Sequence, residues 1–241
     1  TSLLKGDMGH SAIYRRPVAD VIAERFANSL ALMFCAWLFA GIIGFALGCL
    51  MGMFQDKWPD QILKKICYLL SSVPTFWLGL LFLMVFAVRL RWFPIGFSSP
   101  IGVLAQNVTI WDKLHHLFLP AFALGISQTA GVMRYSRSSM LDSMNCDYVK
   151  TARAKGLPEW KVNLFHGFRV ACTPVMVLIG FRLPTLISGA IVIENIFQWP
   201  GVGVWFTDAI KTQNTPIIMS VGLFMVLMVL LSSLLVDILT A

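Results

Sequence analysis

The sequence has few of the charged residues that a soluble domain needs at its surface. Only 13% of its 241 residues are charged, 57% are hydrophobic, and the mean hydropathy is +0.75. Apolar runs long enough to cross a hydrocarbon core of about 30 Å as helices recur along the chain. The period-two alternation of a membrane β-barrel is missing. Because backbone groups in lipid must be hydrogen-bonded within their own element, the composition predicts an all-α, polytopic membrane helix bundle.

Sequence motifs for ATP hydrolysis and for common hydrolases are also missing. The chain has no GxxxxGK[ST] phosphate loop, no HExxH zinc motif and no GxSxG elbow. The apolar runs hold no Asp or Glu in their central portions, which argues against a carrier that powers itself with protons or ions. We therefore predict a chain that is not an enzyme and binds no cofactor. If it moves a solute, the energy comes from another subunit.

Metal-ligand spacing is absent as well. The five cysteines lie in or beside apolar runs and predict neither a disulfide framework nor a zinc site. His115 and His116 are adjacent, and neighbours on a helix point about 100° apart, so an interfacial role is favoured over metal binding. The net charge of +7 does not indicate nucleic-acid binding, because Lys and Arg gather at the ends of apolar runs, where they contact water and lipid headgroups.

Five apolar runs predict five spans in this chain. They cover residues 28–53, 62–88, 117–138, 170–193 and 215–239. In the first run, Gly41, Gly44 and Gly48 are spaced for close helix packing. In the second, Pro74 predicts a kink. The chain starts at Thr1 and ends directly after an apolar run, so we expect it to be part of a longer protein.

Residues 1–27 are polar to amphipathic. Val18, Ile22 and Phe26 recur every four residues after Pro17, which suits a first helical turn. This pattern predicts an extracytoplasmic helix lying in the membrane interface, and an ordinary packed helix under a loop is the alternative. Residues 28–241 are then one transmembrane domain.

A polar segment, residues 143–169, interrupts the apolar runs. Residues 147–155 predict a short helix with Asp147 as its N-terminal cap. Gly156 is placed to stop that helix, and Pro158 suits the first turn of a second helix. The side of the membrane that holds this segment carries ten Lys and Arg residues, against eight on the other side. The charge bias favours a cytoplasmic polar segment, and a merely solvated loop is the alternative to a docking element.

The polar segment resembles the cytoplasmic loop of permease subunits in binding-protein-dependent ABC importers. Other segments are similar to the dipeptide, oligopeptide and nickel branch of that family, in the same order along the chain. These segments are DYVKTARAKGLPEWKV (147–162), GDMGHS (6–11), SSVPTFWLG (71–79), VIENIFQWPGVG (192–203) and LLVDIL (234–239). The chain departs from the broader family at Lys150 and Thr151, where Glu and Ala are usual, and at Arg169, where a proline is usual.

The resemblance implies a type I importer permease with a further span before Thr1. It implies a multi-pass protein of the bacterial or archaeal cytoplasmic membrane, in contact with lipid and not with nucleic acid. It also implies partners: a second homologous permease, two ATP-binding subunits that hold ATP and Mg, and an extracytoplasmic solute-binding protein. The implied cargo is a peptide, nickel or a metal chelate. A membrane channel or scaffold not coupled to ATP is the alternative.

The resemblance also assigns residues. It implies a coupling helix that docks on an ATPase subunit, formed by Asp147, Tyr148, Lys150, Thr151, Ala152, Arg153, Ala154, Lys155 and Gly156. Glu194 lies at the outer end of the predicted span 170–193, and we expect it to be an extracytoplasmic gate or docking residue together with Trp199, Pro200 and Gly201.

The breaks in two apolar runs suggest a translocation path. The candidate path residues are Ser72, Pro74, Arg182 and Pro184. Arg182 is a charge near the middle of a span, which is costly unless it is paired or faces water. It can line the path and bind a carboxylate, or it can be structural, bonded to carbonyls freed by Pro184 or to the partner permease.

Overall fold

The computed structural model describes residues 18–100, 102–103, 107–181 and 183–240, and these residues form helices and loops without a strand. The helices in chain order are α1 (Val18–Met53), α2 (Trp58–Ser72), α3 (Thr75–Phe82), α4 (Ile110–Met144), α5 (Asp147–Ala154), α6 (Glu159–Lys161), α7 (Phe168–Phe181), α8 (Leu183–Phe197), α9 (Val202–Lys211) and α10 (Thr215–Thr240). A π-helical segment, Leu83–Arg89, extends α3, and another, Val162–Gly167, joins α6 to α7.

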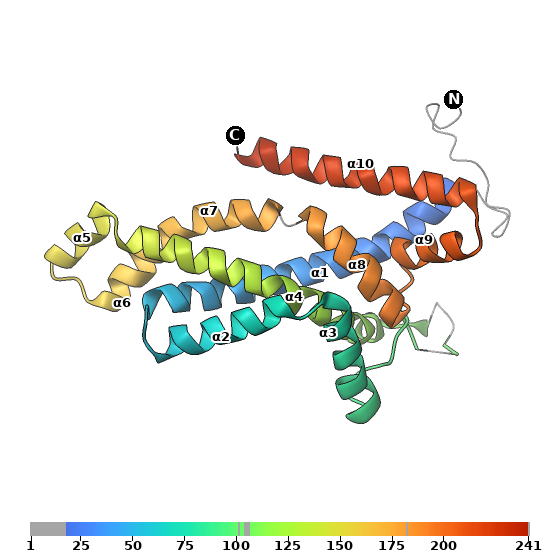
Figure 1. Ribbon diagram of the computed structural model, residues 1–241, viewed down its shortest axis with the longest axis horizontal. Coiled ribbons are helices and arrows are strands. Elements are labelled where there is room, and N and C mark those ends of the chain that lie inside the picture. The colour runs from blue at the N-terminus through green and yellow to red at the C-terminus, as the bar shows by residue number, and fades with distance from the viewer. Residues whose placement is uncertain (1–17, 101, 104–106, 182, 241) are drawn as a thin grey trace.

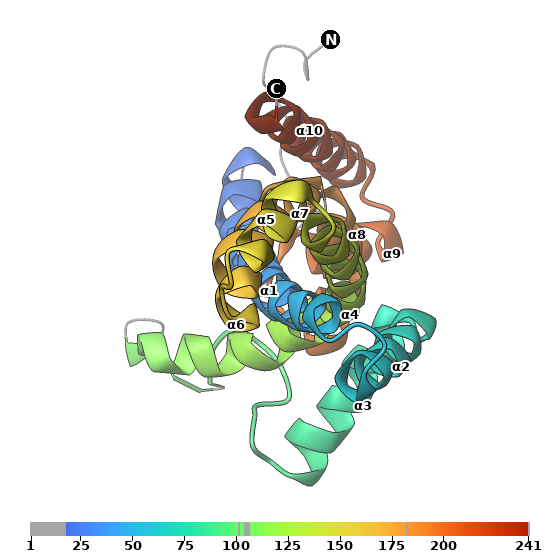
Figure 2. The same ribbon diagram turned by 90° about the vertical axis from the view of Figure 1, so that its left-hand side faces the viewer.

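The bundle is elongated, with α1, α4, α7 and α10 running roughly along its long axis (Figure 1). The short helices α5 and α6 lie at one end, called the α5 end below, together with the turn between α1 and α2. The helix α9 lies at the other end, called the α9 end. Figure 2, viewed from the α5 end, shows α3 projecting sideways from the bundle.

The centre of the bundle is the close pairing of α1 with α4. A Cβ added to Gly44 would lie 2.7 Å from Val132 Cβ, and one added to Gly48 would lie 2.5 Å from the Met133 carbonyl oxygen. Gly52 continues the same row towards the α5 end, 2.7 Å from Met140 Cβ by the same measure. Small residues thus let the two backbones approach, as helices in lipid require. The prediction of close packing is confirmed for Gly44 and Gly48.

At Pro74, where a kink within one helix was predicted, the chain instead forms two separate helices that point in different directions. The helix α2 ends at Ser72, Pro74 occupies the position just before α3, and the two helices are bent by 101°. Pro74 lacks an N–H and restricts the residue before it to extended backbone, and Val73 has φ −95° and ψ 126°. The second predicted span is therefore a bent pair of helices.

Several helix boundaries differ from those predicted. The helix α1 runs without a break from Val18 to Met53, so the predicted boundary between an interfacial helix and the first span at residue 28 is absent from it. Residues 1–17 lie outside the described residues. The helix α4 begins at Ile110, inside the predicted loop 89–116. Thr109 and Asp112 form a capping box there, with N–H to oxygen distances of 2.9 and 3.2 Å. The TxxD sequence at residues 109–112 is the local signal for this box.

Among the residues that the structure describes, three helices are individually long and apolar enough to span a membrane. They are Val21–Met53, Ile110–Met144 and Thr215–Leu234, and the bent pair α2–α3 is a fourth candidate. The predicted span 170–193 corresponds to α7 and α8, which lie on either side of residue 182. Arg182 is outside the described residues, as is the side chain of Pro184. The prediction of an all-α bundle is confirmed, whereas the five spans are not five unbroken helices.

Candidate functional site

The predicted helix at the α5 end exists as α5, and its N-terminus differs in detail from the prediction. Cys146 holds the cap position without a side-chain hydrogen bond, so the prediction that Asp147 caps the helix is wrong. Asp147 lies in the first turn and accepts a hydrogen bond from Lys150 Nζ at 2.9 Å. That bond holds the pKa of the Asp147 carboxyl below its usual value. A carboxylate in the first turn of a helix also interacts favourably with the helix dipole.

The predicted stop at Gly156 is confirmed. Gly156 has φ +76°, its N–H donates to the Arg153 carbonyl at 2.9 Å, and the Leu157 N–H reaches the Ala152 carbonyl at 3.4 Å. These two bonds are the Schellman ending of a helix, which needs left-handed backbone at this residue. Pro158 occupies the position before α6, one residue earlier than predicted. The segment is therefore helix, glycine, helix.

One face of α5 is packed against its own chain. Val149 and Ala152 are buried together with Val162 and next to Met144. Arg153 also bonds Glu159 twice, Nε to Oε1 at 3.0 Å and Nη2 to Oε2 at 3.3 Å. Ala152 therefore points inward, although the resemblance placed it in the docking helix together with Tyr148 and Thr151. The burial and the ion pair fix α5 to the helices that follow it.

The other face of α5 is open. Its exposed residues are Asp147, Tyr148, Lys150, Thr151, Arg153, Ala154, Lys155 and Gly156. Beside it, a hollow of about 370 Å³ is lined by Tyr148, Leu164, Phe165, His166, Arg169 and Val170. Phe165 and Trp160 are each 60% exposed. Exposed aromatic side chains beside cations form a surface suited to a protein partner.

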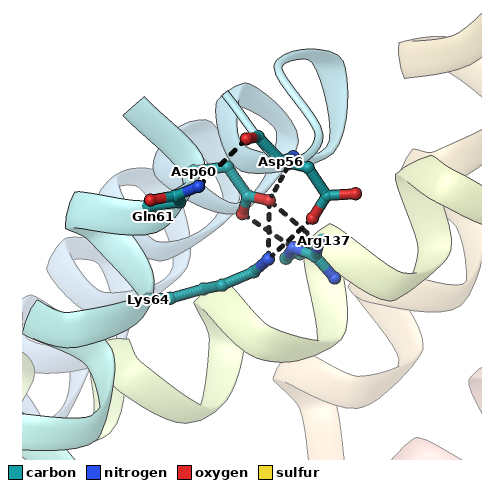
Figure 3. A network of polar contacts seen from close by, with 5 residues as sticks. All are labelled: Asp56, Asp60, Gln61, Lys64 and Arg137. Carbon is teal, nitrogen blue, oxygen red and sulfur yellow. Dashed lines mark hydrogen bonds and ion pairs between the residues drawn. The ribbon is translucent and has the colours of Figure 1, made fainter. Parts of the chain in front are cut away.

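A buried acidic group near the α5 end was missed in the sequence. Asp60, which the sequence placed in a loop, has 0% side-chain exposure. It accepts bonds from Arg137 Nε and Nη2 at 2.8 and 2.9 Å, from Lys64 at 2.8 Å and from the Asp56 N–H at 2.9 Å (Figure 3). These contacts join α2 to α4. In the sequence, the residues that make these contacts appear only as charges at the ends of two apolar runs, and that pattern does not show which of them pair.

The predicted outer residues form a buried network at the α9 end. Glu194 is 1% exposed, and its carboxylate accepts a hydrogen bond from the Ser29 hydroxyl at 2.6 Å on Oε1 and one from the Gly203 N–H at 2.7 Å on Oε2. The Val202 N–H in turn donates to Ser29 Oγ at 2.9 Å. A carboxylate here satisfies the free N–H groups at the start of α9. Gly201 has no room for a Cβ, because the Glu194 carboxylate occupies that space.

Two further bonds close this network around the loop before α9. Trp199 Nε1 donates to the Asn28 carbonyl and Asn28 Nδ2 donates to the Pro200 carbonyl, each at 3.0 Å. Trp199 and Gly201 are buried and Pro200 is half-buried. In this conformation Glu194, Trp199 and Gly201 join α1, α8 and α9, and they offer no open surface for docking.

The candidate path residues are only partly brought together. Ser72 and Pro74 are exposed at the break between α2 and α3. The Ser72 hydroxyl donates to the Tyr68 carbonyl at 2.9 Å, and Ser71 donates to the Cys67 carbonyl at 2.8 Å. Ser71 also accepts a hydrogen bond from Arg134, a contact that the sequence did not predict. The role of Arg182 stays a prediction.

The two adjacent histidines hold a loop in place. His115 Nε2 lies 3.0 Å from the Trp92 carbonyl oxygen, and His116 Nδ1 lies 2.9 Å from the Gly96 carbonyl oxygen. Each ring thus contacts a different backbone carbonyl of the segment after α3. This arrangement fits the favoured non-ligand interpretation.

Comparison with known proteins assigns the family. Residues 44–241 match the family described as "Binding-protein-dependent transport system inner membrane component". Over all 241 residues the chain is 37% identical to the oligopeptide transport system permease protein AppB of Bacillus subtilis, covering 75% of that protein. It is 36% identical to the glutathione transport system permease protein GsiC of Escherichia coli K12, covering 74% of it.

A solved structure supports the fold. The crystal structure of an amino acid ABC transporter with histidines matches 92% of this chain and 94% of its own, with a TM-score of 0.66 and 15% identity. That match concerns the fold alone, which is that of a type I importer permease. The chain therefore belongs to the family of inner-membrane components of binding-protein-dependent transport systems, as a non-catalytic, multi-pass permease subunit of an ABC importer.

Proposed function

We propose that this permease subunit imports peptides and receives the energy for transport from ATP-binding subunits that dock on α5. The curated relatives that support this are an oligopeptide and a glutathione permease, and both cargoes are peptides. Peptides are therefore preferred to nickel or a metal chelate as cargo.

The single observation that carries the coupling role is the two-faced packing of α5. Its inner face is fixed by the buried Val149 and Ala152, the exposed Arg153–Glu159 ion pair ties it to α6, and its outer face is open. A force applied to the outer face is then transmitted to α4 and α7, because α5 lies between them in the chain. A merely solvated loop would not need this buried face.

The proposed assembly contains this chain, a second homologous permease, two ATP-binding subunits and an extracytoplasmic solute-binding protein. ATP and Mg are bound by the ATP-binding subunits, and this chain contributes its half of the translocation path. Ser72, Pro74 and, from the sequence, Arg182 and Pro184 are the proposed path residues. A channel or scaffold without ATP coupling remains the competing function.

The test places a bulky charge on the open face of α5. Ala154 is exposed, so Ala154→Arg leaves the packing of α5 intact and obstructs a docked partner. We expect it to abolish uptake of a labelled dipeptide and to reduce co-purification of the ATP-binding subunit. The matched control is Gln55→Arg, at an exposed position of the α1–α2 turn at the same end of the bundle.

Three results would contradict the proposal. Normal uptake and normal co-purification in Ala154→Arg would exclude docking through α5. Uptake of labelled nickel, but not of labelled dipeptide, by the native transporter would exclude peptides as the cargo. Absence of any ATP-hydrolysing subunit from the purified complex would favour the channel or scaffold.

A further inference from the structure

Arg134 is a positively charged residue in a candidate span, and it lacks an acidic partner within the described part of the chain. It lies on α4, which is long and apolar enough to cross a membrane. Its guanidinium donates to the Ser71 hydroxyl and contacts Cys67 Sγ at 3.9 Å. Neither contact supplies a negative charge. A guanidinium at such a position is costly unless an anion or water reaches it.

The nearby carboxylates are already in use. Asp60 is held by Arg137 through bonds of 2.8 and 2.9 Å and by Lys64 at 2.8 Å. Asp56 is largely exposed and contacts Lys64 at 3.4 Å. Arg137 and Lys64 therefore share one buried carboxylate, as Figure 3 shows, and nothing in this network reaches Arg134. The surface keeps an excess of positive charge.

The guanidinium borders a hollow that a ligand can enter. The hollow has a volume of about 210 Å³ and is lined by Met51, Lys64, Cys67, Tyr68, Arg134 and Arg137. Tyr68 is 64% exposed, so its ring lies at an open rim. Through Ser71 the hollow adjoins the break at Pro74, where Ser71, Ser72 and Pro74 are all exposed.

We propose that Arg134 binds a carboxylate of the cargo as the cargo passes the break between α2 and α3. An arginine can hold a carboxylate through two parallel hydrogen bonds, which are about twice as strong as neutral ones. Every peptide with a free C-terminus carries such a group. The Ser71 hydroxyl keeps the guanidinium in place between successive cargo molecules. This inference rests on the proposed function and adds a residue that selects anionic cargo.

Other anions have the same chemistry and define the competing outcomes. The phosphate of an anionic phospholipid can bind a basic hollow between membrane helices. A carboxylate of a second permease subunit can also pair with Arg134. Cargo is favoured because the guanidinium contacts Ser71, directly before the break at which Ser72 and Pro74 are exposed.

The test uses the complete transporter, with its ATP-binding subunits and binding protein, in proteoliposomes. Uptake of a labelled tripeptide with a free C-terminus is compared with uptake of the same tripeptide as its C-terminal amide. The variants are Arg134→Gln and Arg134→Lys, each measured in vesicles with and without phosphatidylglycerol. Arg89→Gln is the control, because Arg89 is an exposed cation at the far end of the α3 segment.

We expect Arg134→Gln to lower the maximal uptake rate of the free acid by roughly 10-fold or more, as loss of a charged hydrogen bond implies. Uptake of the amide changes little, and Arg134→Lys retains part of the uptake because it keeps the charge but not the two parallel hydrogen bonds. The control variant takes up both peptides normally. The effect is the same in both kinds of vesicle.

Three results would overturn the inference: unchanged uptake of the free acid in Arg134→Gln, equal losses for acid and amide, or a loss that depends on phosphatidylglycerol. The last result would assign the site to lipid. If the binding protein delivers no amide, the Lys variant and the two kinds of vesicle decide. Failure of the native transporter to take up any tripeptide would instead refute the proposed function.

Discussion

The two ends of the bundle use their polar residues in opposite ways. At the α9 end, Glu194 and Ser29 are buried and bonded to each other and to backbone N–H groups. At the α5 end, most polar side chains of α5 are exposed and pair only with neighbours in the sequence. The first arrangement joins helices of one chain, and the second leaves a rigid face available to another chain. Burial therefore separates the stabilising polar residues from the proposed docking residues.

The largest expected effect is at the α9 end. Glu194→Ala removes the acceptor of the Ser29 hydroxyl and of the Gly203 N–H, both in a buried site. Leaving such groups unsatisfied costs about 3 kcal/mol in total. We expect a clear fall in the unfolding temperature of the purified subunit. Asp208→Ala, which removes an exposed carboxylate 3.6 Å from Lys211, is the control and has little effect. Equal unfolding temperatures for native and Glu194→Ala proteins would refute the stabilising role.

A substitution of Asp60 tests whether a polar residue stabilises the fold because it is buried, whichever end of the bundle it lies near. Asp60→Asn leaves Arg137 and Lys64 without their shared carboxylate near the α5 end. Because both cations are partly exposed and regain water, we expect a loss of about 2 kcal/mol, less than for a fully buried pair. A double-mutant cycle with Arg137→Gln measures the coupling. A coupling energy near zero would contradict the contact that Figure 3 shows.

Gly156 tests how much the rigidity of α5 matters. A Cβ at Gly156 meets nothing within 4 Å, so the obstacle to substitution is the positive φ alone. Asn tolerates this backbone and Val does not. We expect Gly156→Val to cost about 1–2 kcal/mol locally and to lower uptake strongly, and Gly156→Asn to retain most uptake. Loss of uptake in both variants alike would show that the backbone conformation is not the cause.

The smallest effect on stability is expected at the Arg153–Glu159 pair. Both side chains are substantially exposed, 41% and 65%, so the pair is screened by water. Arg153→Gln should change the free energy of unfolding by less than about 1 kcal/mol. Uptake should fall more than stability does, because Arg153 belongs to the open face. A large loss of stability would place Arg153 with Glu194 among the stabilising residues.

Local signals in the sequence predicted local structure well. Gly156 was recognised because a helix that ends in left-handed backbone favours glycine at that position. The row of glycines in α1 was recognised from its spacing of three and four residues. Pro74 gave the break between α2 and α3, although a proline does not determine how far the chain turns.

Contacts between distant residues were not predictable from one sequence. Asp60 and Arg137 are 77 positions apart, and Ser29 and Glu194 are 165 apart. Nothing local distinguishes the buried Asp60 from the exposed Asp56. The burial of Ala152 was not predictable either, because a periodicity of three to four residues shows which residues share a face without showing which face is buried.

The glycine contacts between α1 and α4 have a mechanical consequence. At Gly44, Gly48 and Gly52 the backbone of α1 packs directly against α4, which leaves no space for one helix to slide along the other. The two helices are therefore expected to move together as one rigid unit. In the proposed mechanism, a movement of α5 caused by docked ATP-binding subunits is transmitted along this rigid pair, and the bend at Pro74 between α2 and α3 is a place where the chain can change direction.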